Sequence, residues 1–280
     1  MMSVQNRQRI SYVFLCATPF VAFGAILVRP LRIPGLYHVI GAVLFVAISA
    51  AAWTLGARAI RADVQSRRQL ALAGMLLVAP FAMIALLWVG LGGPWAATAA
   101  ENQMRYLELI LVAILTTIGS VMLKEALSEA GERVYSTLGF GVMIMAGSVY
   151  IVWDAFVFAG YFTLEHGGEM APAIVSLRPF HNILVSVAAA LTYFATAAFA
   201  ASLAKINWLG RKASLAYIIV SVIALALMIV TIAEHPDPAA DVAWYAIPGF
   251  ILVIPALPLI MPALLGAVLL RRAGNEEARD

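Results

Sequence analysis

Long apolar stretches separated by short polar segments run along the whole chain. Eight of these stretches are 18 to 27 residues long, close to the roughly 20 residues that a helix needs to cross a hydrocarbon core about 30 Å thick. The apolar runs are continuous and do not alternate, which predicts helices and not the strands of a membrane barrel. The predicted spans are residues 10–28, 36–55, 70–91, 106–123, 138–162, 180–203, 213–232 and 244–270.

The composition supports the same assignment. Hydrophobic residues make up 63% of the sequence and charged residues 12%, whereas a soluble domain is about half apolar and a quarter charged. No segment between the spans is long enough for a soluble domain, so we predict an all-α, polytopic helical bundle that forms one membrane domain over residues 1–280. A basic loop after the second span and an acidic, Trp-containing loop after the third recur in both halves, which suggests a duplication of 1–130 and 131–280.

The distribution of basic residues predicts the orientation. Of the 18 Lys and Arg residues, 14 lie in the two ends of the chain and in the loops after the second, fourth and sixth spans, and 4 lie in the other loops. Because basic loops stay in the cytoplasm, both termini are predicted to be cytoplasmic, in a cell (inner) membrane protein. The net charge of +3 follows from this topology, so the bilayer is the expected partner and no nucleic acid is.

Common catalytic signatures are missing from the sequence. It contains no phosphate-binding loop of the Walker type, dinucleotide fingerprint, CxxC pair, HExxH helix or GxSxG elbow. Cys16 is the only cysteine, so no intrachain disulfide can form. These absences weaken the case for the common enzyme classes without excluding them, and any function must reside in the bundle or at its rims.

Asp154 is the strongest candidate for a functional residue, because a carboxyl group at membrane depth is costly and therefore suggests function. Eight residues separate it from the end of its predicted span, which is about 12 Å of helix. Arg178 and His181 lie three residues apart near the start of the next span, on one helical face. We predict that Asp154 faces the interior with one of them as its partner, in a structural ion pair or in a ligand, proton or metal site.

Three other sets of polar and aromatic residues are given structural roles. Glu108 is predicted to form an interfacial ion pair with Arg105. Glu132 is assigned, with Lys124 and Arg133, to a solvated cytoplasmic loop. Six aromatic residues are expected mostly to mark the outer headgroup level, namely Trp88, Trp95, Tyr106, Trp153, Tyr161 and Trp244.

The last predicted span contains four prolines within 15 residues, Pro248, Pro255, Pro258 and Pro262. Each lacks a backbone N–H and tends to kink a helix. We therefore predict a kinked or interrupted helix between Pro248 and Pro262. Two interpretations remain open: a bent structural helix, or a hinge or discontinuous helix that lines a cavity.

The four histidines fall on the outer half in this topology, together with several loop carboxylates. His38, His181 and His235 are the candidate ligands for zinc, copper or haem. No two of them have metal-ligand spacing on one helix, so the sequence assigns no metal and leaves the cofactor unknown.

Residues 193–211, with the sequence YFATAAFAASLAKINWLGR, contain a helix rich in small residues followed by a short basic turn. Together with the ending LLRR at residues 269–272, they resemble an uncharacterised family of bacterial polytopic inner-membrane proteins. The resemblance covers mainly the C-terminal half and implies a bacterial inner-membrane setting. It transfers no functional residue.

Three classes of function remain open. The first is a non-enzymatic binding, sensing or accessory subunit, packed with other membrane subunits and carrying a small polar site in the outer half of the bundle. The second is a secondary transporter coupled through Asp154. The third is a membrane enzyme, or a haem or metal protein, that uses the outer histidines and carboxylates.

Overall fold

The computed structural model describes residues 3–28, 35–94, 97–168, 176–233 and 249–275. Within these ranges the chain forms eight α-helices and no strand. The helices are α1 (Val4–Val28), α2 (Leu36–Ile60), α3 (Gln65–Ile84), α4 (Ala99–Glu129), α5 (Val134–Glu165), α7 (Arg178–Lys205), α8 (Arg211–Ala233) and α9 (Ile260–Asn275). A π-helical turn, η1 (Ala85–Val89), extends α3, and a 3₁₀ turn, η4 (Phe250–Val253), precedes α9.

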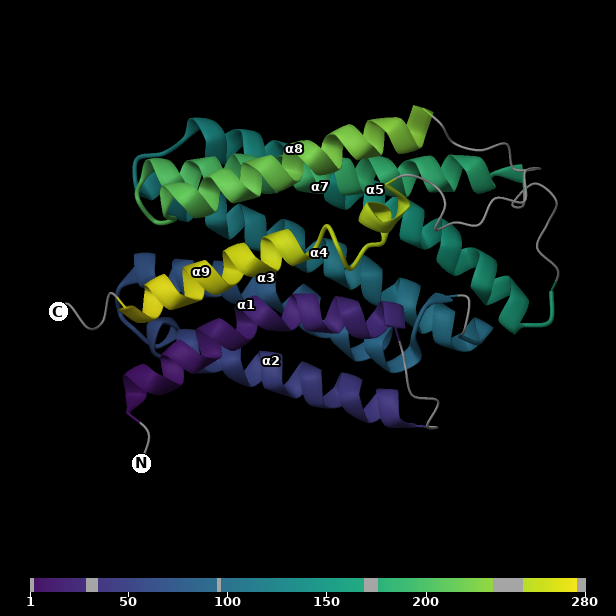
Figure 1. Ribbon diagram of the computed structural model, residues 1–280, viewed down its shortest axis with the longest axis horizontal. Coiled ribbons are helices and arrows are strands. Elements are labelled where there is room, and N and C mark those ends of the chain that lie inside the picture. Colours follow the sequence, from purple (N-terminus) through teal and green to yellow (C-terminus); the bar gives the residue numbers. More distant parts are fainter. Residues whose placement is uncertain (1–2, 29–34, 95–96, 169–175, 234–248, 276–280) are drawn as a thin grey trace.

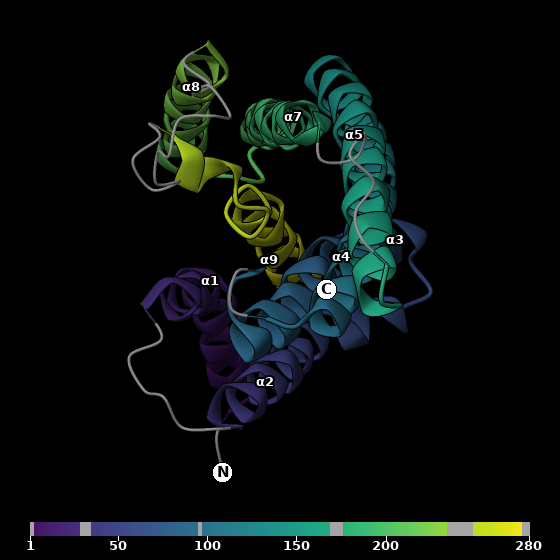
Figure 2. The ribbon, with the colours of Figure 1, turned by 90° about the vertical axis from the view of Figure 1, so that its right-hand side faces the viewer.

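Most helices pack against their neighbours in the chain, and α9 is the exception. Contacts join α1 to α2, α2 to α3, α3 to α4, α4 to α5, α5 to α7 and α7 to α8. Helix α9 instead contacts α1, α2, α3 and α7, and Figure 2 shows it between the group formed by α1 to α4 and the α7–α8 pair. The start of α1 and the end of α9 lie at the same end of the bundle (Figure 1).

Six helices of the described chain are long and apolar enough to cross a membrane: α2, α3 with η1, α4, α5, α7 from Phe180, and α8. Large apolar side chains also lie on the outside, as Ile223 and Ile229 do on α8, where lipid can cover them. The fold is therefore compatible with a multi-pass membrane protein. The eight-span topology stays a prediction, since neither α1 nor α9 is among the six and the 16 residues of α9 extend only about 24 Å.

The predicted span 244–270 is not one continuous helix where the structure describes it. After η4, residues 254–259 form bends and turns, and α9 begins only at Ile260. Pro255 and Pro258 lie in this irregular segment, where neither can donate a backbone hydrogen bond. Pro262 lies in the first turn of α9, where a helix has no use for the missing N–H. Pro248 is outside the described residues, and the hinge function stays a prediction.

Two glycines allow α9 to enter the centre of the bundle. A Cβ on Gly266 would lie 2.7 Å from the carbonyl oxygen of Gly74 on α3, and a Cβ on Gly74 would lie 2.9 Å from that of Gly266. Both separations are too short for real side-chain atoms, so the two backbones touch only because neither residue has a side chain. Ala263, Leu265 and Leu269 of α9 are buried around this crossing.

Glu132, in the α4–α5 turn, holds the start of α5 against the end of α7. Its Oε1 accepts hydrogen bonds from the backbone N–H groups of Val134 (3.0 Å) and Tyr135 (3.1 Å). Its Oε2 accepts from the N–H of Ser136 (3.0 Å) and from the hydroxyl of Ser202 on α7. The residue is 1% exposed, so the prediction of a solvated loop was wrong for Glu132. We call this arrangement the Glu132 clamp.

Candidate functional site

The candidate site lies between α4 and α5. Gly147 of α5 faces Thr117 of α4 so closely that a Cβ on the glycine would overlap the threonine hydroxyl. This close approach brings one face of α4, with Leu109, Val112 and Thr116, opposite Tyr150 and Asp154 of α5.

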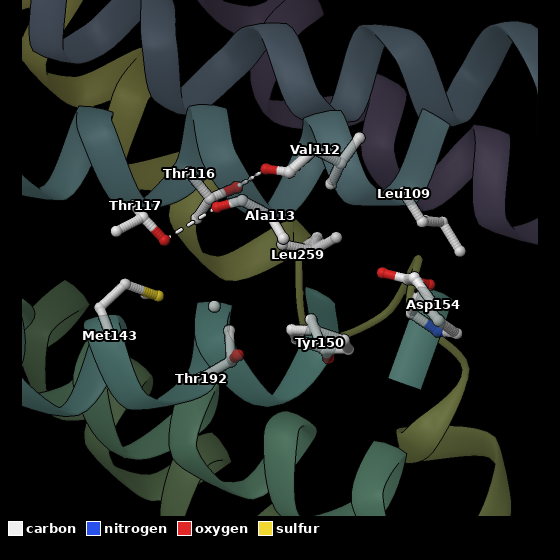
Figure 3. Close-up of a pocket in the computed structure, with 12 residues that line it drawn as sticks. Leu109, Val112, Ala113, Thr116, Thr117, Met143, Tyr150, Asp154, Thr192 and Leu259 are labelled. Atoms are coloured by element: carbon white, nitrogen blue, oxygen red, sulfur yellow. Dashed lines mark hydrogen bonds between the residues drawn. The ribbon is translucent and has the colours of Figure 1, made fainter. Parts of the chain in front are cut away.

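A small cavity occupies this interface, which we call the α4–α5 cavity. The volume of this cavity is about 10 Å³, which is enough for about one water molecule. Figure 3 shows Asp154 near Leu109 at one end, with Thr117 and Met143 at the other. Thr192 of α7 and Pro255 and Leu259 of the irregular segment also line it, so four parts of the chain meet here.

Three threonine hydroxyl groups line the cavity, and each can only accept a further hydrogen bond because its own proton is already donated. Thr116 donates to the Val112 carbonyl (2.8 Å), Thr117 to the Ala113 carbonyl (2.8 Å) and Thr192 to the Ala188 carbonyl (2.9 Å). Each hydroxyl proton is thereby used within its own helix (Figure 3 shows the first two bonds). The lone pairs of these oxygens remain for a proton donor or a cation.

Asp154 is 0% exposed, so the carboxyl group lies inside the bundle. Neither carboxyl oxygen accepts a hydrogen bond from any residue that the structure describes. An ionised carboxylate in such a place carries a penalty of several kcal/mol, because it has lost its water without gaining a partner. The group is therefore least costly as a neutral acid or with a cation against it.

The proposed partners of Asp154 are only partly described. The ring of His181 stacks against Phe156, with 6.1 Å between the ring centres. Phe156 is two positions from Asp154 and thus faces a different side of α5. The side chain of Arg178 lies outside the described residues. Pairing of Asp154 with Arg178 or His181 therefore stays a prediction.

Glu108 is a second buried carboxyl group, which the sequence analysis assigned to an interfacial ion pair. It is 6% exposed, and neither of its oxygens accepts a hydrogen bond from a described residue. Arg105 instead donates to the Gly92 carbonyl (2.6 Å) and to Asn102 (2.5 Å), while its guanidinium lies 4.9 Å from the centre of the Trp88 ring. The predicted ion pair was wrong, although Glu108 still experiences the charges of both Arg105 and Asp154.

Aromatic side chains surround these two carboxyl groups. Tyr106 of α4 meets Trp153 edge-on with ring centres 5.5 Å apart and stacks on Tyr161 at 5.6 Å. Trp88, Tyr106 and Trp153 are buried against other parts of the chain, and their place at the outer headgroup level stays a prediction.

The candidate metal ligands do not meet in the described part of the chain. Within it, no three His, Cys, Asp or Glu residues are grouped closely enough to hold a metal ion. His38 is exposed on α2, and His181 packs on Phe156. His235 lies outside the described residues.

No family model, curated protein or solved structure matches the chain. The resemblance to bacterial inner-membrane proteins therefore remains an expectation, and functional arguments rest on the geometry of the site.

Proposed function

We propose that this protein is a non-enzymatic membrane protein that binds a proton at Asp154, in the α4–α5 cavity, as a sensing or coupling site. One observation supports this most strongly. Asp154 is fully buried with both carboxyl oxygens unbonded to described residues, yet the cavity beside it has threonine oxygens. A carboxyl group kept there for packing alone would be expected to have a fixed donor.

The size of the cavity limits what can bind. Room for about one water molecule excludes an organic ligand, since pockets for such ligands measure about 300–1,000 Å³. A proton delivered by one water fits this space. Glu108, which precedes Leu109 of the cavity lining on α4, adds a second buried carboxyl group that accepts no hydrogen bond from a described residue.

Infrared difference spectroscopy on the purified protein tests the proposal directly. The C=O stretching band of a protonated carboxyl group is followed as the pH is changed. We expect a band that persists at neutral pH and is lost in Asp154→Asn, which keeps the shape of the side chain but cannot exchange a proton. Glu165→Gln is the matched control, because Glu165 lies on the same helix but is exposed.

Three variants, Asp154→Asn, Glu165→Gln and Glu108→Gln, separate the possible outcomes. Loss of the band in Asp154→Asn with an unchanged spectrum in Glu165→Gln supports proton binding at Asp154. Loss in Glu108→Gln alone would move the proton to Glu108 and contradict the assignment. Absence of any protonated carboxyl band at neutral pH would refute the proposal, provided that circular dichroism shows the wild-type fold.

A transport function is the second candidate, favoured by the irregular segment before α9. Pro255 and Leu259 of this segment line the same cavity as Asp154, and discontinuous helices beside intramembrane charged groups recur in secondary transporters. The test uses proteoliposomes that contain a pH-sensitive dye, with a membrane potential imposed. Proton entry that Asp154→Asn abolishes and Glu165→Gln retains supports transport. Proton binding without entry supports a sensing role.

A further inference from the structure

A second, larger cavity lies near the start of α1 and the end of α9. It measures about 440 Å³ and is lined by residues of α1, α2 and α9, namely Gln5, Gln8, Arg9, Tyr12, Val13, Leu55 and Arg271. We call it the α1–α9 cavity. It shares no lining residue with the α4–α5 cavity, so it requires an explanation of its own.

The polar lining of the α1–α9 cavity consists of groups that bind anions. Arg9 and Arg271 contribute two guanidinium groups, each with five N–H donors, and two glutamine amides and the Tyr12 hydroxyl lie beside them. Among the residues that the structure describes, none that lines the cavity is acidic. Neither arginine forms an ion pair with a carboxylate of the described chain.

Packing fixes the position of one arginine. The guanidinium of Arg271 lies 4.5 Å from the centre of the Tyr12 ring, a cation–π contact that holds the charge at the cavity wall. Next to this wall, the backbone of α9 comes close to α1 and α2: a Cβ on Gly274 would lie 3.0 Å from the Leu55 carbonyl oxygen and 3.3 Å from Gln8 Nε2. Arg9 and Arg271 are 262 positions apart in the chain. The packing of α9 against α1 and α2 brings them to the same cavity.

The cavity also has an apolar side that faces outward. Leu55 is 1% exposed and closes the inner wall, while Val13 is 57% exposed and lies where lipid can reach it. Basic groups at a membrane surface attract anionic lipid headgroups, and arginine forks match the oxygens of a phosphate group. A site with arginines on one side and an apolar edge on the other suits a ligand that has both an anionic group and an apolar part, as a lipid has.

We propose that the α1–α9 cavity binds an anionic phosphate group, with Arg9 and Arg271 as its two principal contacts. A phosphate on a membrane lipid and a phosphate on a soluble molecule present the same chemistry to the arginines. The experiment therefore has one arm for each source.

The test measures the thermal midpoint of the purified full chain in detergent, because a ligand of the folded state raises this midpoint with its concentration. One arm adds micelles with phosphatidic acid and compares them with micelles containing phosphatidylcholine. The other adds inorganic phosphate and compares it with chloride at equal ionic strength. We expect phosphatidic acid to stabilise the protein more than phosphatidylcholine does. A rise in the thermal midpoint with inorganic phosphate but not with phosphatidic acid would instead identify a phosphate on a soluble molecule as the ligand.

The variants Arg9→Gln and Arg271→Gln should each weaken the binding of the active probe by about tenfold or more, since each loses charge-assisted hydrogen bonds. Arg211→Gln is the matched control: it removes one exposed positive charge at the start of α8, away from the cavity lining. Arg271→Lys keeps the positive charge but lacks the planar guanidinium that can donate two parallel hydrogen bonds to a phosphate. Its affinity for the active probe should therefore lie between those of the wild type and Arg271→Gln.

Each outcome decides for or against the site. An equal loss of binding in all three glutamine variants would show a general surface-charge effect and overturn the proposal. So would the absence of a shift with both phosphatidic acid and phosphate. Because Arg9 and Arg271 are exposed, the variants should fold, and the midpoint without ligand checks this for each one.

Discussion

The Glu132 clamp yields a quantitative prediction about stability. Glu132→Gln keeps the shape of the side chain but removes its charge and turns an NH₂ group toward backbone N–H donors. The carboxylate accepts three backbone hydrogen bonds at the start of α5 and one from Ser202. Loss of a helix cap costs about 1 kcal/mol and loss of a charged hydrogen bond about 1.5–3 kcal/mol. We therefore expect a destabilisation of about 2–3 kcal/mol.

The assay is unfolding in mixed detergent and SDS, followed by circular dichroism near neutral pH. Ser202→Ala should cost about 1 kcal/mol, because it removes one of the four bonds. Glu125→Gln serves as control, since the Glu125 carboxylate is half exposed and its ion pair with Lys124 should contribute less than about 1 kcal/mol. Equal midpoints for Glu132→Gln and Glu125→Gln would refute the reasoning.

The pH dependence gives an independent check. Burial acts to raise the pKa of Glu132, but the hydrogen bonds from Ser202 and from the backbone of Tyr135, Ser136 and Val134 outweigh it and hold this pKa below its ordinary value. A carboxyl group with a lowered pKa in the folded state stabilises the fold above its unfolded pKa, about 4.3. The contribution disappears as the pH falls through the lower, folded value. The difference between wild type and Glu132→Gln should therefore be constant near neutral pH and shrink below about pH 4.

Two further predictions concern packing and topology. Gly266→Leu should destabilise the bundle by about 1–3 kcal/mol through overpacking against α3, whereas Gly141→Leu, with open space around it, should have little effect; equal SDS unfolding midpoints would contradict the proposed crossing. Reporter fusions placed after Arg272 and within residues 234–241 should report opposite sides of the membrane, as the distribution of basic residues requires. Reporters on the same side would rule out the predicted topology.

The sequence predicted those features that depend on local patterns. The six candidate spans follow from runs of apolar residues, and the break before α9 coincides with Pro255 and Pro258. Asp154 was identified from its depth along one helix, and the structure places it in the interior. The duplication of the two halves stays a prediction.

The wrong predictions concern contacts between distant parts of the chain. A spacing of three residues suggested an ion pair between Arg105 and Glu108. The Arg105 guanidinium instead donates a hydrogen bond to the Gly92 carbonyl, which lies in another segment. Glu132 was assigned to solvent because its partner Ser202 lies 70 residues further along the chain. The α1–α9 cavity was not predicted for the same reason, since Arg9 and Arg271 come together only after the bundle has formed.

The central position of α9 constrains the biogenesis of the protein. This helix follows every other described helix in the chain, yet its residues fill the space that α1, α2, α3 and α7 surround. The ribosome must therefore deliver the earlier helices into the bilayer before the segment that fills their centre exists. Until α9 is synthesised, the apolar surfaces of α1, α2, α3 and α7 that α9 will cover face lipid or a chaperone. A polypeptide that stalls before residue 260 would lack the helix that fills the centre of the bundle, a defect by which membrane quality-control proteases could recognise it.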